Sequence, residues 1–272
     1  MSSHPSAWNP AQYDRFRSER QQPFHDLLAL LHPRPEMRVV DLGCGSGELT
    51  RLLHDRLTAR ATLGLDSCAT MLAGSSAFAA PGLRFAAADV GTFDAVGDYD
   101  LVFSNAALHW VADHAALFAR LTRALADGGQ LAVQMPYNFD YPSHTVAAAV
   151  AREAPFRAAL GGFAVEPSVQ TPEWYAATLH RLGFSRQHVR LQVYTHLLET
   201  RAAVVEWVKG SLLTAYQQRL PADLWPAFLA RYSERLLPQL ADTRPFFYPF
   251  QRLLIWGARA GCATPRAARR RP

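Results

Sequence analysis

The chain has 272 residues, of which 49% are hydrophobic and 19% are charged, as in a globular protein with a sizeable core. No apolar run reaches the roughly 18 residues of a membrane-spanning helix and no basic-then-apolar leader opens the chain, so we expect a cytoplasmic protein without a membrane partner. The three cysteines lie far apart, which argues against a disulfide framework, and much of the net charge of +5 is in the last residues, which argues against a nucleic-acid partner.

Apolar residues recur along the chain in alternating strand and helix patterns. The expected elements, in chain order, are a helix over 24–31, a strand over 38–42, a helix over 49–57, strands over 61–65, 83–87 and 99–104, a helix over 118–125, a strand over 130–134, helices over 144–153 and 172–182, a strand over 187–197, two or three helices within 201–240 and a last strand over 252–259. This alternation predicts an α/β protein with a parallel sheet and helices on both faces.

The same order divides the chain into five segments. They are an N-terminal arm and helix (1–32), an α/β core (33–200), a helical insertion (201–248), a last core strand (249–262) and a basic tail that we expect to be disordered (263–272).

The most informative motif follows the first expected strand, where residues 41–47 read DLGCGSG and a second strand ends in Asp66. Glycines after a strand let the backbone turn tightly and approach a ligand, and an acid after the second strand accepts hydrogen bonds from ribose hydroxyls. Glu48 stands where a dinucleotide fingerprint has its third glycine, and a carboxylate there would repel a pyrophosphate. Asp41 suits a ligand with a cationic amino group instead.

The string DLGCGSGELT at 41–50 resembles motif I of the class I S-adenosylmethionine (SAM) methyltransferases. The resemblance to this class continues through DS at 66–67, ADV at 88–90 and FSNAALHW at 103–110. Within the class the chain is most similar to the trans-aconitate 2-methyltransferases, through WNPxxYxxFxxER at 8–20 and the segments AVQMP, EWV and FQRL at 132–136, 206–208 and 250–253. The resemblance spans roughly residues 8 to 260. It implies a doubly wound, seven-stranded Rossmann-like methyltransferase sheet, SAM as cofactor, and a helical cap over the cofactor formed by 201–248.

The resemblance also implies which residues bind SAM. By role they are Asp41, Gly43, Gly45 and Asn105 for the methionine moiety, Asp66 and Ser67 for the ribose, and Asp89 and Val90 for the adenine. Ser67 can also cap the helix that follows it.

Methyl transfer to a carboxylate needs no general base, because a carboxylate is already ionised at pH 7. Such an acceptor needs cationic and hydrogen-bonding anchors. The candidate substrate-binding residues are Trp8, Tyr13, Arg20, His109, Trp110, Trp207 and Arg252, and His109 is also the candidate catalytic base. Trp110 and Trp207 can equally be core aromatics, and Arg20 can simply pair with a neighbouring acid. The histidines show no metal-ligand spacing, so we expect no metal.

One departure from the family pattern bears on the acceptor. Where the trans-aconitate enzymes tend to place Arg-Pro, this chain has Thr214-Ala215, and Lys209 or Arg219 would have to replace the missing anchor. The expected partner is a small carboxylic acid such as trans-aconitate and the expected state is a monomer. A phenol, an amine or a lipid-linked acid stays open as acceptor, as do two other classes: an NAD-type oxidoreductase and a non-catalytic SAM-binding protein.

Overall fold

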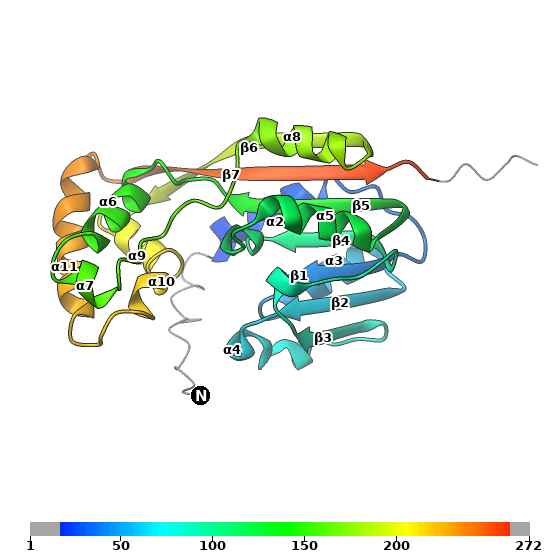
Figure 1. The fold of residues 1–272 in the computed structure, drawn as a ribbon, viewed down its shortest axis with the longest axis horizontal. Coiled ribbons are helices and arrows are strands. Elements are labelled where there is room, and N and C mark those ends of the chain that lie inside the picture. Colours follow the sequence, from blue (N-terminus) through cyan, green and yellow to red (C-terminus); the bar gives the residue numbers. More distant parts are fainter. Residues whose placement is uncertain (1–16, 262–272) are drawn as a thin grey trace, which may run out of the picture.

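The computed structural model describes residues 17–261, with side chains from residue 21 onward. Its centre is a seven-stranded sheet in the order β3-β2-β1-β4-β5-β7-β6 (Figure 1). The strands are β1 (Arg38–Leu42), β2 (Ala61–Asp66), β3 (Leu83–Ala87), β4 (Tyr99–Asn105), β5 (Leu125–Pro136), β6 (Phe184–Leu198) and β7 (Phe246–Arg259). β1 to β5 pair in parallel, and β7 is antiparallel to both β5 and β6. The strand order reverses between β1 and β4, where α/β sheets commonly bind nucleotides.

Helices connect these strands in the expected alternation. They are α2 (Arg17–Leu28), α3 (Glu48–Leu57), α4 (Ala69–Leu72), η1 (Ser75–Phe78), η2 (Val90–Thr92), η3 (Leu108–Trp110), α5 (His114–Ala124), α6 (Pro142–Ala151), α7 (Phe156–Ala159), α8 (Pro172–Arg181), α9 (Ala203–Lys209), α10 (Thr214–Gln217), α11 (Trp225–Leu236) and η4 (Leu237–Gln239). None of the helices in residues 17–261 has the length and apolar character that crossing a membrane requires.

Alternate residues of β1 belong to two separate apolar clusters, one on each face of the sheet. Val39 belongs to a cluster with Leu27 of α2 and Leu53 of α3, while the next residue, Val40, belongs to a cluster with Leu121 of α5 and Leu179 of α8. Successive side chains of a strand point to opposite faces, so helices pack on both sides of the sheet. The expected doubly wound, seven-stranded Rossmann-like α/β sheet is confirmed.

β6 and β7 continue past the edge of the sheet as a two-stranded ribbon. The last β5–β7 partners are Pro136 and Arg252, whereas β6 and β7 stay paired as far as Leu198 and Phe246. The ribbon carries a group of helices beyond the carboxyl ends of β1, β4 and β5 (Figure 1). The last strand begins at Phe246 and not near 249, because its first residues pair with β6 alone.

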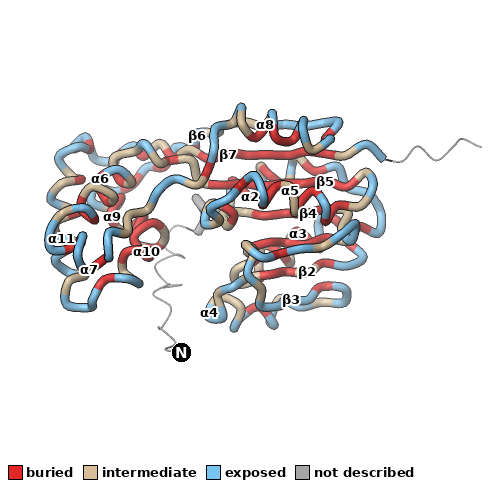
Figure 2. Tube along the Cα trace, viewed as in Figure 1, coloured by how far each residue is buried: buried red, intermediate tan, exposed pale blue. Residues whose placement is uncertain are grey.

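The helices on the ribbon form one cap with its own apolar core. Val150 of α6, Phe156 of α7, Val204 of α9, Tyr216 of α10 and Phe228 of α11 share a buried cluster. Figure 2 shows buried stretches within the cap. The sequence puts α6 and α7 in the 33–200 core and confines the cap to 201–248. The structure differs, because helices inserted before β6 and after β6 pack together.

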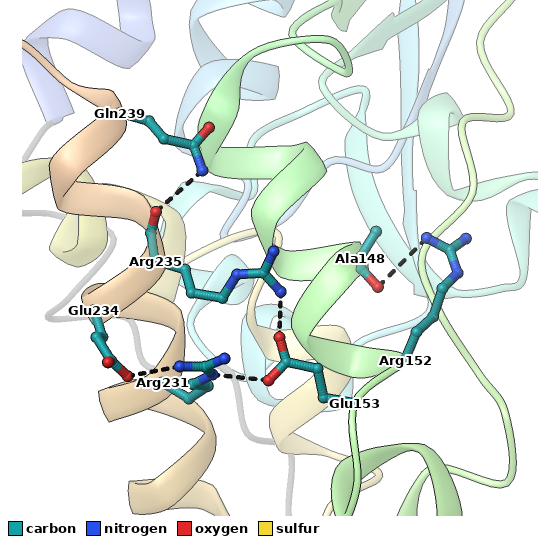
Figure 3. A network of polar contacts seen from close by, with 7 residues as sticks. All are labelled: Ala148, Arg152, Glu153, Arg231, Glu234, Arg235 and Gln239. Carbon is teal, nitrogen blue, oxygen red and sulfur yellow. Dashed lines mark hydrogen bonds and ion pairs between the residues drawn. The ribbon is translucent and has the colours of Figure 1, made fainter.

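Ion pairs join the two insertions of the cap (Figure 3). Glu153, just after α6, accepts a hydrogen bond from Arg231 Nε at 2.8 Å, and Arg235 contacts its other oxygen. Arg231 also pairs with Glu234 at 3.0 Å. The Arg231 guanidinium, helped by that of Arg235, holds the pKa of Glu153 below its ordinary value. The end of α6 is thereby fastened to α11.

Candidate active site

The loop after β1 meets the segment after β4 at the carboxyl edge of the sheet. Gly43 and Cys44 both donate their N–H groups to the Leu65 carbonyl in β2, at 2.7 and 3.0 Å. Gly43 has a φ of +83°, and a Cβ on it would lie 2.1 Å from the Cβ of Ala107. Position 43 therefore needs glycine for its backbone angle and for this close approach. Gly45, with a φ of +58°, continues the same turn.

Asp66, at the end of β2, is tied to the glycine loop. Its Oδ2 accepts the Gly45 N–H at 2.9 Å and its Oδ1 accepts the Cys68 N–H at 2.8 Å. A carboxylate has about four acceptor positions, so the half-buried group still has capacity for hydroxyl donors. Ser67 is exposed and does not cap α4: Cys68 precedes the helix, and no side chain caps it. The predicted Ser67 cap is wrong, because the N-cap position of α4 is Cys68 and no side chain accepts a hydrogen bond from the first turn.

Asp89 lies at the same edge, two residues after β3 ends. Its Oδ1 accepts the Gly91 N–H at 2.7 Å, and this bond begins η2 at Val90. The Asp89 side chain is exposed, whereas Val90 packs half-buried against the apolar cluster that contains α5. The strand ends thus present a carboxylate beside an apolar side chain, an arrangement suited to an amino-bearing aromatic ring such as adenine.

Asp41, in β1, is the buried acid of the site. It is 4% exposed, and its Oδ2 accepts a 2.6 Å hydrogen bond from Oγ1 of Thr50 in α3, which is 0% exposed. Burial raises the pKa of Asp41 to about 7; the Thr50 bond opposes the rise and the charge of Asp66 adds to it. A cationic ligand group beside Asp41 would offset the cost of its buried charge.

Three neighbouring strands place polar side chains on one face of the same edge. Asn105 in β4 is in register with Gln134 in β5, and Arg252 lies in β7 two residues from the register partner of Gln134. Residues two apart on a strand share a face, so all three lie on one side of the sheet. Arg252 is 5% exposed; its Nη1 is 3.5 Å from Gln134 Oε1 and its guanidinium lies 4.9 Å from the centre of the Phe250 ring.

Several buried polar atoms near this edge lack a hydrogen-bond partner within residues 17–261. They are Asn105 Oδ1, His109 Nδ1, Gln134 Nε2 and Asn138 Nδ2. Buried polar groups are nearly always paired, so such a group of atoms indicates that a ligand completes the site. Two of the four are amide donors, and with the Arg252 guanidinium they make a face suited to carboxylate oxygens.

His109 and Trp110 belong to η3 (Leu108–Trp110), which follows β4 and contacts β5. Their rings lie 4.7 Å apart, and Trp110 is 53% exposed. Burial lowers the pKa of His109 to about 3, and the charge of Arg252 adds to this effect. His109 is therefore neutral near pH 7, and its proton affinity is far too low for an efficient general base there.

The other predicted acceptor residues have different surroundings. Trp207 is 2% exposed and packs against the rings of Tyr248 and Phe250, so the structure supports the alternative of a core aromatic, here in the cap. Trp8 and Tyr13 lie outside the described residues, as does the tail. Arg20 belongs to α2, but its side chain is likewise outside the described part. Within residues 17–261, no group of histidines, cysteines or acids has an arrangement that could hold a metal ion.

Three residues near the acceptor end are not among the predicted site residues, although one of them, Gln134, lies in the AVQMP segment at 132–136. Gln134 and Asn138 bracket the end of β5, and His144 comes from α6 of the cap. The positive charge that His144 would carry contributes to the lowered pKa of His109, and burial lowers its own pKa to about 4. These side chains belong to different insertions and strands, so only the tertiary structure brings them together.

The fold matches that of known methyltransferases. A family model described as "Methyltransferase domain" matches residues 40–133. A solved SAM-dependent methyltransferase from Mesorhizobium loti is 27% identical with a TM-score of 0.50, over 87% of this chain and 97% of that one. A Haemonchus contortus phosphoethanolamine N-methyltransferase, solved with SAM, aligns over 96% of this chain and 60% of its own with a TM-score of 0.53, and at 15% identity shows the fold alone.

Relatives named trans-aconitate 2-methyltransferase match most of the chain. The one from Deinococcus radiodurans is 41% identical over 259 residues, which is 93% of this chain and 98% of the relative. The one from Variovorax paradoxus is 42% identical over 231 residues, which is 84% of this chain and 88% of the relative. The protein is a SAM-dependent methyltransferase, and it belongs to the trans-aconitate 2-methyltransferase family.

Proposed function

We propose that this enzyme transfers a methyl group from SAM to a carboxylate of a small organic acid, trans-aconitate being the first candidate. The observation that carries the proposal is the buried Arg252 guanidinium, next to amide donors of Gln134 and Asn138 that lack partners within residues 17–261. A phosphate- or carboxylate-bearing ligand is what such a face binds best, and the names of the relatives point to the carboxylate.

The residues at the ends of β1, β2 and β3 fit SAM. Asp41 would hold its amino group, Asp66 its ribose and Asp89 its adenine, while Gly43 and Gly45 keep the loop free of side chains where the methionine moiety approaches. SAM, when bound, supplies an electrophilic methyl group on a sulfonium. Asn105, at the end of β4, would lie between the two ligands, because β4 adjoins both β1 and β5.

For the acceptor, the protein's task is to orient one carboxylate and exclude water. The carboxylate is ionised at pH 7 and attacks as it stands, so no residue has to remove a proton. Arg252 would fix the acid by charge and by its planar set of N–H donors. The cap on the β6–β7 ribbon, which lies beyond the carboxyl ends of β1, β4 and β5 (Figure 1), would cover the edge where the two ligands meet. A phenol or amine would need a base, and His109 is a poor one.

The anchor missing from the family pattern is not replaced by its nearest candidates. Thr214 is buried inside the cap. Lys209 Nζ lies 2.9 Å from Glu206 Oε1, and the Arg219 guanidinium lies 4.1 Å from the centre of the Phe163 ring. We therefore assign the anchoring charge to the buried arginine of β7. The proposal includes a monomeric cytoplasmic enzyme that binds neither nucleic acid nor membrane.

The test is methyl transfer from methyl-labelled SAM to trans-aconitate, its cis isomer and other small di- and tricarboxylates, with phenols and amines alongside. We expect label in a carboxylic acid product and its release by mild alkali, because methyl esters hydrolyse whereas methyl ethers and methylamines do not. The trimethyl ester of trans-aconitate has no free carboxylate and should accept no label. Label in an alkali-stable phenol or amine product would contradict the proposal.

A further inference from the structure

The hydrogen bond between Thr50 and Asp41 links the helix after the glycine loop to the acid before it. Thr50 lies in the first turn of α3, and its Oγ1 donates to Asp41 Oδ2 at 2.6 Å. Both side chains are almost fully excluded from water, at 0% and 4% exposed. Neither the glycine motif nor the proposed ligand contacts require a hydroxyl at position 50. The bond therefore needs a separate explanation.

The surroundings of Asp41 make this bond important. The charge of Asp66 in β2 raises the pKa of Asp41. Cys44 in the glycine loop is the other titratable neighbour, and its own pKa is raised by burial and by the charges of Asp41 and Asp66. Neither group supplies positive charge. The Thr50 hydroxyl is the interaction that favours the ionised form of Asp41 in the protein without ligand.

We propose that Thr50 is a positioning residue for SAM: its hydroxyl holds the Asp41 carboxylate ionised and oriented toward the amino group of the cofactor. The inference rests on the proposed placement of that amino group at Asp41. With Oδ2 engaged by Thr50, the other oxygen of Asp41 is left to accept from the ligand.

The pH dependence of SAM binding follows from this arrangement. The pKa of Asp41 is near 7, so below that pH a growing fraction of the protein is protonated at Asp41 and binds the cationic amino group poorly. SAM affinity should thus rise with pH toward 7 and level off above it. At alkaline pH the SAM affinity should decline again, because the amino group of SAM loses its proton and with it the positive charge that Asp41 binds. Only the decline of SAM affinity on the acid side of the profile depends on the hydrogen bond between Thr50 and Asp41.

The test compares SAM dissociation constants from pH 5.5 to 8 in four proteins. Thr50→Val keeps the side-chain shape and removes the hydroxyl, so the acid side should move to higher pH by about one unit and affinity at pH 6 should fall about tenfold. Thr50→Ser keeps the hydroxyl and should restore the wild-type profile. Asp41→Asn cannot titrate and should bind weakly at all pH values, without the acid-side decline.

A second readout uses the protein without SAM. The pKa of Asp41 is raised on folding, so its burial destabilises the wild type as pH rises from about 4 and the effect levels off near 7. The stability of Asp41→Asn relative to the wild type should grow over that range. The stability difference between Thr50→Val and the Thr50→Val, Asp41→Asn double variant should level off at a higher pH, because the pKa of Asp41 is higher without the Thr50 hydroxyl.

The possible outcomes distinguish a wrong placement of the amino group of SAM at Asp41 from a wrong role for Thr50. Native SAM affinity in Asp41→Asn would overturn the placement of the amino group, and the inference with it. A weakened Asp41→Asn together with an unshifted Thr50→Val profile would overturn the role of Thr50 alone, as would a Thr50→Ser protein that behaves like Thr50→Val. If Thr50→Val does not fold, Thr50→Ala removes the same hydroxyl, and an acid side of its profile that stays where the wild type has it overturns the inference.

Discussion

Replacing Asp66 by alanine should weaken SAM binding at least a hundredfold while the sheet stays folded. Each oxygen of Asp66 already accepts one backbone N–H, from Gly45 and from Cys68, and the ribose hydroxyls would use the remaining acceptor positions. Hydrogen bonds to a charged group are worth about 1.5–3 kcal/mol each, so losing two of them corresponds to a hundredfold or more. S-adenosylhomocysteine has the same ribose and should lose the same factor. Calorimetric titration measures both.

The control for Asp66 is Asp113→Ala. Asp113 also accepts a backbone N–H, that of Ala116 at 3.0 Å, and caps α5. Its loss should cost about 1 kcal/mol of stability, as cap removal does, and leave SAM affinity unchanged. SAM affinity near that of the wild type in Asp66→Ala would contradict the assignment of this acid to the ribose.

Gly43→Ala should abolish SAM binding and lower stability by about 3 kcal/mol or more, because two costs add. A non-glycine residue is strained at a φ of +83°, and the new Cβ would lie 2.1 Å from the Cβ of Ala107. Relief requires the loop after β1 to move away from the segment after β4, which spoils the surface where the methionine moiety approaches. Thermal unfolding without SAM and a SAM titration measure the two effects.

Gly97 offers a matched control for the backbone cost. It has a φ of +68°, and a Cβ there would meet nothing within 4 Å. Gly97→Ala should therefore lose about 1 kcal/mol from the left-handed angle alone and bind SAM normally. Equal stability losses in the two variants would mean that the contact with Ala107 is unimportant.

The cofactor end could be predicted from the sequence because its residues follow strands in short, local patterns. Asp41, Asp66 and Asp89 each lie at or just past the end of a parallel strand, so identifying the strands is enough to bring these acids to one edge. The hydrogen bond from Thr50 to Asp41 could not be predicted, because helix periodicity does not say where a buried hydroxyl finds its acceptor.

The acceptor end was harder because it depends on contacts between distant segments. Arg252 is brought beside Gln134 by an antiparallel pairing across more than a hundred residues, and His144 arrives on a helix of the cap. The sequence suits Trp207 equally to the substrate or to the core, and the aromatic rings packed against it in the cap favour the core. The cap itself combines two insertions, a combination that the order of elements along the chain conceals.

The most direct test of the acceptor site is a paired measurement on Arg252→Gln: the KM for trans-aconitate and the dissociation constant for SAM. Loss of a buried charge-assisted anchor should raise the acceptor KM about tenfold to a hundredfold. SAM affinity should stay near the wild-type value, because Arg252 lies at the β5–β7 side of the edge, away from β1 and β2.

The control is Arg259→Gln, near the other end of the same strand, where Arg259 donates to the Leu125 carbonyl. It should change neither constant. An unchanged acceptor KM in Arg252→Gln, or a loss of SAM affinity in its place, would contradict the assignment of the acceptor carboxylate to this arginine.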